Sequence, residues 1–361
     1  GRVNNMRILV FDLMKSGEDF LHIPPFFTDL LRISYETGSR VMTNSWGGLE
    51  EGREYSSLTR EMDEFLLEHD DYMIIQASGN DGDQGVNSPG VFKNGITVGA
   101  SMNSYASWKE NYPFDPFVMT RPEIYNEQNL FTFSSWGEPG GRRKPNLVAP
   151  GGAIKSARSG GGQMLLYGSS MSSPLIAWKY MAIKAQLPKN VSALVPYGIM
   201  LASSESLTGY LVEYSPLGSV RHGKVNQKGD GWGLAVGNAN PKNWAWIDRV
   251  KMSQGVREWC FESKQKGRNQ TVVLLWRDLA NWPGTKGELV LDYDLRVVLE
   301  GAKEKKEAMM LNDHRNNIEK ISWRSMKHEK VRIQVSVGSD PVDYHIPLKF
   351  TLVFSKSLKQ V

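Results

Sequence analysis

The chain has 361 residues with a formal net charge of +4, and 40% of its residues are hydrophobic. This length and composition are typical of a globular protein with a sizeable core and room for more than one domain. Basic residues are interleaved with acidic ones and do not gather into a stripe with aromatic residues, so nucleic acid is not an expected partner. No run of roughly 18 apolar residues predicts a membrane-spanning helix, and any targeting segment is expected upstream of residue 1.

Three residues bear on disulfide bonds, on metal sites and on the cellular compartment. The single cysteine, Cys260, excludes an intramolecular disulfide and a multi-cysteine metal site, and we expect it to be a buried or half-buried small apolar residue. Asn-x-Ser/Thr sequons at Asn190 and Asn269 are compatible with a secretory route.

The first segments of the chain predict parallel β/α/β construction. Residues 7–11 form an apolar run of strand length, followed by a loop marked by Gly and Pro. Residues 26–35 have apolar positions at helical spacing, with Gly38 as a stop signal, and residues 40–45 return to a strand pattern.

The next segments continue this alternation. We expect a helix at residues 58–69 and strands at 72–77 and 94–100. Residues 103–129 are polar, aromatic and proline-containing, and we expect a solvated surface insertion there. Helices are predicted at 175–187, where an apolar stripe suits packing on a sheet, and at 191–203.

The composition changes beyond about residue 254. Five strand-length runs follow, separated by polar turns and without a helix of comparable strength, at residues 271–276, 289–299, 318–323, 331–337 and 348–354. Short strands at this density predict a β-sandwich. We therefore divide the chain into domains at residues 1–253 and 254–361.

The sequence GSSMSSP at residues 168–174 precedes the helix predicted at 175–187. A Gly-led turn that delivers a hydroxyl group to a helix start is a plausible nucleophile site, because free N–H groups and the positive end of the helix dipole lie beside it. The alternative is an ordinary N-capped helix, since Ser before a helix and Pro in its first turn are common start signals.

Two further stretches favour the nucleophile site. QASGNDG at residues 76–82 and PNLVAPG at 145–151 precede GSSMSSP, and together the three resemble the A-A-G-N-x-G, K-P-D-x-x-A-P-G and G-T-S-M-A-x-P motifs of the subtilisin-like serine proteases. The resemblance implies that Ser170 is the nucleophile and that the Asn80 amide helps to form the oxyanion hole. The chemistry requires these groups, because a serine hydroxyl needs a base and the tetrahedral oxyanion needs fixed donors.

The same resemblance implies two walls of a substrate cleft. Its first wall is Ser45, Trp46, Gly47 and Gly48, and its second is Ala77, Ser78 and Gly79. Glycines there would let a peptide main chain approach closely and pair like an added strand. The alternative for the first wall is a plain exit from a strand into a loop. FSSWG at 133–137 and GDGWG at 229–233 also resemble segments of this family.

The C-terminal part resembles subtilases that carry a jelly-roll domain. The matches are LWRD at 275–278, LDYDL at 291–295 and NDHRNNIE at 312–319. Asp292 and Asp294 lie two apart on a predicted strand and so point to one face, where calcium could balance their charge, with Asp278 or Asp313 as additional ligands. The alternative is a solvated face with Lys or Arg neighbours. No cofactor is expected for the chemistry itself.

The family's Asp and His segments, D-[ST]-G and H-G-T-H, do not occur in the sequence. His22 and His69 lack the Gly neighbours of the family's histidine, and Asp12 aligns with the strand after the missing His helix, so none of them is given a catalytic role. We expect the Asp and His of the triad to lie upstream of residue 1, and we expect this segment alone to be inactive.

The sequence therefore predicts a doubly wound, mostly parallel α/β fold, N-terminally truncated, followed by a jelly-roll-like β-sandwich. The resemblance implies the function of a secreted serine endopeptidase acting on polypeptide substrates. The alternative is a noncatalytic binding protein, in which the cleft holds peptides and the β-sandwich recognises a partner or a glycan. An α/β-hydrolase esterase is not favoured, because Ser172 occupies the position where its G-x-S-x-G motif requires glycine.

Overall fold

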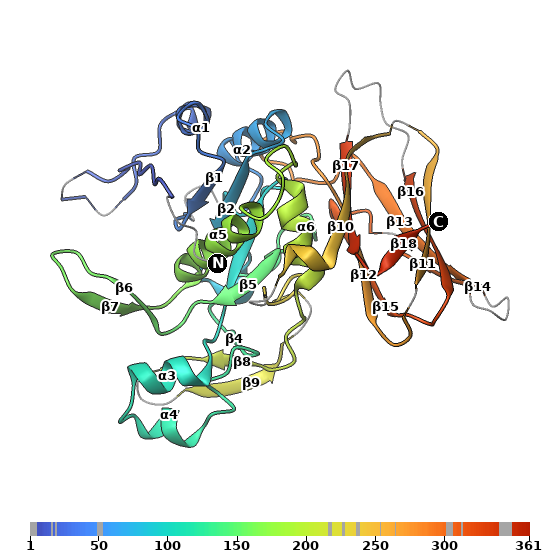
Figure 1. The fold of residues 1–361 in the computed structure, drawn as a ribbon. Helices are drawn as coiled ribbons and strands as arrows, with labels where there is room; N and C mark the ends of the chain where they lie inside the picture. The colour runs from blue at the N-terminus through green and yellow to red at the C-terminus, as the bar shows by residue number, and fades with distance from the viewer. Residues whose placement is uncertain are drawn as a thin grey trace.

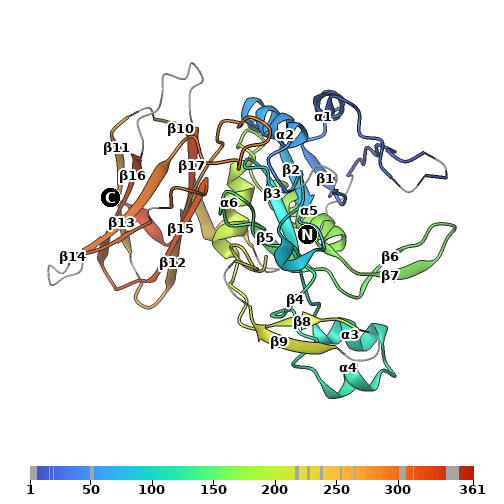
Figure 2. The ribbon, with the colours of Figure 1, turned by 180° about the vertical axis from the view of Figure 1, so that it is seen from behind.

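The computed structural model describes residues 6–361 except 16, 19, 49–52, 216–218, 226–227, 236–238, 253, 264, 301–305, 312 and 339–348. Figure 1 shows an α/β part and a C-terminal part made of β-sheets. Seen from behind in Figure 2, the C-terminal sheets lie on the side of α6 (Leu194–Ser203), away from the hairpin of β6 (Ile154–Ala157) and β7 (Gln163–Leu166).

The α/β part is built on a mixed sheet. Its order is β1-β2-β3-β4-β8-β9, and β5 pairs with β3. Pairings β1/β2, β2/β3, β3/β5 and β4/β8 are parallel, and β3/β4 and β8/β9 are antiparallel. The strand bounds are β1 Val41–Asn44, β2 Met73–Ala77, β3 Ile96–Ser101, β4 Leu130–Phe131, β5 Leu147–Pro150, β8 Tyr210–Glu213 and β9 Val220–Lys224. The predicted α/β fold is confirmed, with antiparallel strands added to the parallel ones.

Helices cover both faces of this sheet, as alternation along β2 requires. Met73 and Ile75 belong to the apolar cluster of α5 (Ser169–Lys184) and α6. Tyr72 and Ile74 belong to the cluster of α1 (Phe27–Glu36) and α2 (Ser57–Glu68). Because successive side chains of a strand point to opposite faces, an apolar run such as that of β2 is stable only when both faces are covered.

The predicted strand at residues 7–11 is wrong. These residues have no strand structure, and Ile8 and Val10 are 73% and 76% exposed. The periodicity of an apolar run indicates what the run could form, but a strand also needs a neighbour to pair with, and the described residues place none beside it. The sheet order accordingly begins at β1.

The predicted solvated insertion at residues 103–129 instead has a core. It forms α3 (Tyr105–Asn111) and α4 (Pro116–Thr120), and Trp108 and Val118 are both 1% exposed. Two of the aromatic residues that made the segment look irregular, Trp108 and Tyr125, are buried in this core. The lysine-rich sequence of residues 303–306 predicts a second solvated loop, which lies almost wholly outside the described residues.

Two sheets form the C-terminal part, with orders β10-β17-β12-β15 and β14-β13-β16-β11-β18. Residues from both sheets share one apolar cluster, so the sheets pack face to face. The strand bounds are β10 Trp244–Lys251, β11 Val256–Ser263, β12 Asn269–Trp276, β13 Tyr293–Glu300, β14 Lys306–Met310, β15 Ile318–Arg324, β16 Glu329–Val337, β17 Lys349–Ser355 and β18 Leu358–Gln360. Jelly-roll topology stays a prediction.

β10 lies N-terminal to residue 254, where the sequence placed the start of the second domain, and it pairs with β17 of the C-terminal sheets. The domain division itself stays a prediction. Cys260 on β11 is exposed, contrary to expectation, because its neighbours Trp259 and Phe261 are the residues of this strand that pack on the core.

Buried polar contacts join the two parts. Lys93, on the loop before β3, is 1% exposed, and its Nζ donates a 2.6 Å hydrogen bond to Asp278 Oδ2. Asn94 Nδ2 donates to the Asp278 main-chain oxygen at 2.8 Å, and Arg277 Nη2 donates to the Tyr72 oxygen at 2.6 Å. Burying these polar and charged groups without partners would cost folding free energy. The two parts therefore stabilise each other.

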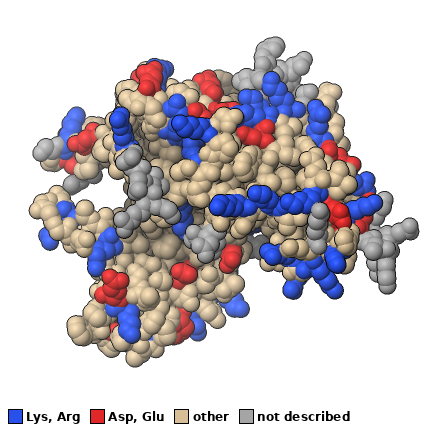
Figure 3. All heavy atoms as spheres, viewed as in Figure 1, with Lys and Arg blue, Asp and Glu red and all other residues tan. Residues whose placement is uncertain are grey.

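On the face drawn in Figure 3, basic and acidic side chains are spread over both parts of the molecule. None of the helices in the described ranges combines the length and apolar character required to cross a bilayer.

Candidate active site

Ser170 lies in the first turn of α5. The helix begins after Gly168, whose φ of 135° and ψ of 165° are open essentially to glycine alone. The Ser170 hydroxyl is partly exposed and donates a 3.1 Å hydrogen bond to the Ser45 main-chain oxygen. The Ser45 hydroxyl in turn donates to the Ser170 oxygen at 2.8 Å. The predicted nucleophile thus lies at a helix N-terminus, against the loop that follows β1.

Asn80, in the loop after β2, contacts the start of the same helix. Its Oδ1 accepts hydrogen bonds from the Ser169 main-chain N–H at 2.9 Å and from the Ser169 hydroxyl at 3.1 Å. The amide nitrogen Nδ2 makes no hydrogen bond within the described residues, and Asn80 is exposed to solvent. Two donors on the oxygen fix the orientation of the amide and leave its N–H groups available to a ligand.

Ser169 is a site residue that the sequence analysis missed. Its hydroxyl accepts a 3.2 Å hydrogen bond from the Gly79 N–H while it donates to Asn80. The side chain is 1% exposed. Ser169 therefore links one predicted cleft wall to the predicted oxyanion residue. The signal was available, because the family's G-T-S motif also has a hydroxyl residue before its serine.

Ser170 and Asn80 line one pocket of about 410 Å³. Five of the predicted wall residues line it with them: Ser45, Trp46, Gly47, Ala77 and Gly79. The other two do not. Ser78 is fully buried, because alternation along the chain turns it away from the side of Ala77 and Gly79, and the Gly48 N–H donates to the Ser88 oxygen at 3.4 Å.

Asp81 and Asn87 also line the pocket and were not predicted. Asn87 Nδ2 donates to Asp81 Oδ2 at 2.7 Å, and the Asp81 N–H donates to the Ser135 hydroxyl at 2.9 Å. Ser135 belongs to the FSSWG segment, and its neighbour Ser134 accepts from the Ala100 N–H at 2.9 Å. The segment thus supports the loop that carries Asn80.

The aromatic residues of the 103–129 insertion support the other side of the site. Tyr167, directly before Gly168, shares hydroxyl hydrogen bonds with Tyr112 of the insertion and with Tyr214, the latter at 3.3 Å. The rings of Tyr167 and Tyr214 stack at 4.7 Å. Burial, together with these hydroxyl contacts, raises the pKa of Tyr167 well above its usual range. The insertion therefore packs against the segment that leads into the helix of Ser170.

Five of the six histidines lie in the described part of the chain, and none of these five lines the pocket. His22 contacts Glu18, and His69 stacks on Phe65 at 4.0 Å and bonds its main-chain oxygen. The other three described histidines pair with carboxylates away from the pocket.

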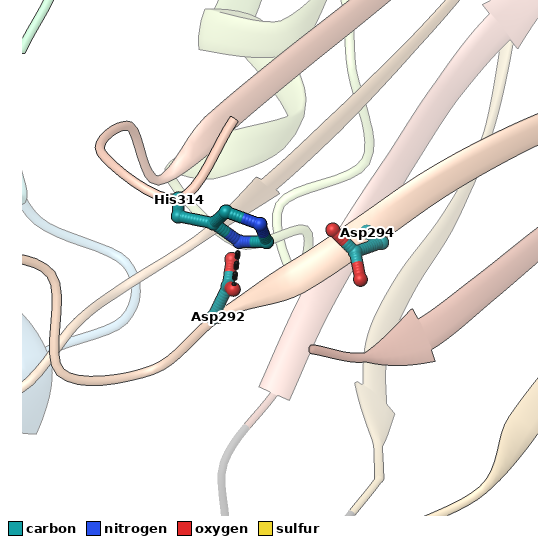
Figure 4. A group of neighbouring side chains, drawn as sticks. All are labelled: Asp292, Asp294 and His314. Atoms are coloured by element: carbon teal, nitrogen blue, oxygen red, sulfur yellow. Dashed lines mark hydrogen bonds and ion pairs between the residues drawn. The ribbon is translucent and has the colours of Figure 1, made fainter. Parts of the chain in front are cut away.

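The predicted metal ligands lie in the C-terminal part. Asp292 and Asp294 come together with His314, which the sequence analysis did not include (Figure 4). Neither of the candidate additional ligands, Asp278 and Asp313, belongs to this group. Asp278 pairs with Lys93 and accepts hydrogen bonds from the main-chain N–H groups of residues 290 and 291, before β13. Asp313 accepts hydrogen bonds from the Arg315 N–H and from Asn316 Nδ2.

Comparison with solved structures finds similarity to a maturation protease and a macrocyclase. One is the prenylagaramide maturation protease PagA, with 19% identity, a TM-score of 0.41 and coverage of 58% of this chain and 64% of that one. Another is the PatG macrocyclase in complex with peptide, with 18% identity, a TM-score of 0.39 and coverage of 58% and 52%.

Two curated relatives come from Dictyostelium discoideum. They are the serine protease/ABC transporter B family proteins tagB, 24% identical over 98% of this chain, and tagD, 25% identical over 82%. The chain spans only 26% and 23% of the length of these relatives. The model of the subtilase family matches residues 27–228, which is more than half of the 361 residues. The chain therefore belongs to the subtilase family of serine proteases.

Proposed function

We propose that the chain supplies the nucleophile and the oxyanion donors of a serine endopeptidase. The Ser170 oxygen attacks the carbonyl carbon of a peptide bond while its proton passes to a base. Asn80 Nδ2 and the Ser170 main-chain N–H donate to the oxyanion. The base then protonates the leaving amine, the C–N bond breaks, and an acyl-enzyme on Ser170 remains for water to hydrolyse.

One observation carries this proposal: the orientation of the Asn80 amide beside Ser170. Ser169 holds the amide oxygen with two hydrogen bonds, so the N–H groups are the part left for a ligand in the pocket that Ser170 shares. A donor fixed before the substrate arrives stabilises a developing oxyanion without the cost of reorientation.

The general base and the Asp that orients it belong, in this proposal, to residues outside the described part of the chain. The Ser170 hydroxyl donates its hydrogen bond to the Ser45 main-chain oxygen, and this contact holds it in place without a base. We expect the 361-residue segment alone to leave peptide bonds intact, since an unassisted serine hydroxyl is a weak nucleophile.

Polypeptides are the proposed substrates. β1 is an edge strand in the described sheet, and the residues that follow it, Ser45 to Gly47, line the pocket opposite Ala77 and Gly79. An extended peptide between these walls would exchange main-chain hydrogen bonds with them, as an added strand does. The side chain before the cleaved bond would then enter the pocket.

Peptide hydrolysis by the natural full-length form tests the proposal. A quenched-fluorescent peptide library should be cleaved by the wild type and by Ser159→Ala, an exposed serine outside the pocket, but not by Ser170→Ala. Binding of peptides without cleavage by any variant would contradict the proposal and favour the noncatalytic alternative.

We also propose that the protein passes through the secretory pathway. The sequon residues Asn190 and Asn269 are both exposed, as glycan attachment requires. Protein from its natural source should lose mass on treatment with an N-glycosidase, and Asn190→Gln combined with Asn269→Gln should abolish that loss. An unchanged wild-type mass would contradict the use of these sites.

A further inference from the structure

Three side chains of the types that bind metal ions lie together at one end of the C-terminal sheets, far from Ser170 in sequence. Asp292 directly precedes β13, Asp294 is the second residue of that strand, and His314 lies in the turn before β15. Their ligand atoms all lie within 4.8 Å of one another. Figure 4 shows the imidazole of His314 directed toward the carboxylate of Asp292, with the Asp294 carboxylate beside them.

Each carboxylate of this cluster has one oxygen that receives no hydrogen bond from the described residues. Asp294 is only 6% exposed, and its Oδ1, like Asp292 Oδ1, is buried without a hydrogen-bond partner in the part of the chain that the structure describes. A buried carboxylate oxygen without a donor is costly, and two carboxylates at this distance repel each other. The unpartnered oxygens therefore point to a missing positive ligand.

Protein cations do not fill that role within the described residues. Among the described residues, Asp292 forms one ion pair, between its Oδ2 and His314 Nδ1 at 2.5 Å. No described Lys or Arg forms an ion pair with Asp292 or Asp294. The alternative of a solvated face balanced by Lys or Arg neighbours thus lacks support. His314 is itself accessible, with its side chain 58% exposed.

The space beside the carboxylates is kept open by Gly338 at the end of β16. A Cβ atom on this residue would lie 2.5 Å from Asp292 Oδ2 and 3.0 Å from Asp294 Oδ2. The Gly338 N–H donates to the Asp292 main-chain oxygen at 2.8 Å, which holds the two segments together.

The donor set discriminates between ions. Calcium takes oxygen ligands, whereas an imidazole nitrogen combined with carboxylate oxygens suits zinc and similar divalent transition metals. We propose that Asp292, Asp294 and His314 bind a divalent transition-metal ion of the zinc type, in place of the calcium ion expected from the two carboxylates alone. His314 would exchange its hydrogen bond with Asp292 for shared coordination of the ion.

Such an ion would anchor a turn that joins the two parts of the molecule. Two residues after His314, the Asn316 side-chain oxygen accepts the Arg143 N–H at 2.7 Å, and Asn317 Nδ2 donates to the Lys93 oxygen at 3.1 Å. Binding at His314 would tie this turn to β13. Since an ion that binds only the folded state stabilises it, zinc should raise the unfolding temperature.

Calorimetric titration of the chelator-treated chain with Zn²⁺ tests the proposal, using protein without a histidine tag. We expect one ion per chain. The His314→Ala variant should bind zinc at least about 100-fold more weakly. Replacing a residue that only hydrogen-bonds to a metal ligand already lowers the metal affinity about 10–100-fold, and loss of a ligand itself should cost more. The matched control is His328→Ala, since His328 is 64% exposed and also bonds a carboxylate, Glu262, at 2.8 Å. This control should bind like the wild type.

Other outcomes would overturn the assignment. Equal zinc affinity of wild type and His314→Ala would mean that His314 is not a ligand. An increase in unfolding temperature with Ca²⁺ but not with Zn²⁺, unchanged by His314→Ala, would mean an oxygen-only calcium site. Because His314 is exposed, its replacement should leave the fold intact, and Asp294→Asn then tests the buried ligand separately.

Discussion

The Ser169 main-chain N–H donates a 2.9 Å hydrogen bond to the side-chain oxygen of Asn80, although the two residues are 89 positions apart. This contact places the start of the Ser170 helix and the loop after β2 in one fixed arrangement. It also decides which end of the Asn80 amide is left for a substrate. In the proposed function, one side chain therefore serves both the fold and the chemistry.

Substitutions at Asn80 should separate these two roles. Asn80→Asp keeps the oxygen that accepts from Ser169 but removes the N–H donor, so kcat should fall about 10²–10³-fold, the range for removal of an oxyanion-hole donor, with little loss of stability. Asn80→Ala should also lose about 1 kcal/mol of unfolding free energy, because the helix start loses its acceptor. Peptidase assays of the natural full-length form measure the first effect and urea unfolding measures the second. A wild-type kcat in Asn80→Asp would contradict the donor role.

Gly168→Ala should destabilise the site. The backbone of Gly168 adopts a conformation that costs other residues about 1–3 kcal/mol, and an added Cβ would lie 3.3 Å from Asn80 Nδ2. Gly223→Ala is the control, since a Cβ there meets nothing within 4 Å and its φ is not positive. Urea unfolding of both variants should show a loss for Gly168→Ala only, and equal stabilities would argue against the strain.

Lys93→Met should weaken the whole molecule. The substitution leaves Asp278, which is fully buried, without its ion-pair partner, and removal of one member of such a pair costs about 3–5 kcal/mol. The exposed residue Lys109 provides the control variant Lys109→Met. Denaturant unfolding followed by tryptophan fluorescence measures the loss. A change below about 1 kcal/mol would mean that this contact does not couple the two parts.

The stability of the molecule should depend on the protonation of Lys320. Burial lowers the pKa of Lys320 from 10.5 to about 8, with Arg143 as a further cause, and its Nζ donates to the Ser204 main-chain oxygen at 2.9 Å. Between these values the unfolded chain binds a proton that the folded chain does not, so this residue makes stability rise with pH, by at most about 1.4 kcal/mol per pH unit.

The comparison of Lys320→Met with Lys359→Met, an exposed lysine on β18, isolates this contribution. Unfolding free energy measured from pH 8 to 10.5 should rise less steeply in Lys320→Met than in the control. Parallel curves for the two variants would show that Lys320 titrates alike in the folded and unfolded chain.

The features that the sequence predicted depend on local patterns. The apolar periodicity of α1, α2 and α5 and the run of β2 are short-range signals, and the motifs around Asn80 and Ser170 carry functional groups at fixed spacing. Successive side chains of an extended chain point to opposite faces. This is why Ala77 and Gly79 line the pocket while Ser78, between them, is buried.

The features that the sequence did not predict depend on contacts between distant segments. His314 joins Asp292 from a turn 22 residues away, and Lys93 meets Asp278 across 185 residues. The strand β10 precedes the change in composition on which the domain boundary rested, and the pattern of residues 7–11 could not reveal whether a pairing strand lies beside them. Local periodicity contains no information about such partners.

The most direct test of the central claim is covalent labelling by a fluorophosphonate, mapped by tandem mass spectrometry on the natural full-length form. The account predicts a single adduct on the peptide that contains Ser170, absent from Ser170→Ala and retained in Ser159→Ala, because only a serine activated by a base and facing an oxyanion site reacts. Absence of an adduct on Ser170 in the mature full-length protein would contradict the proposed peptidase activity.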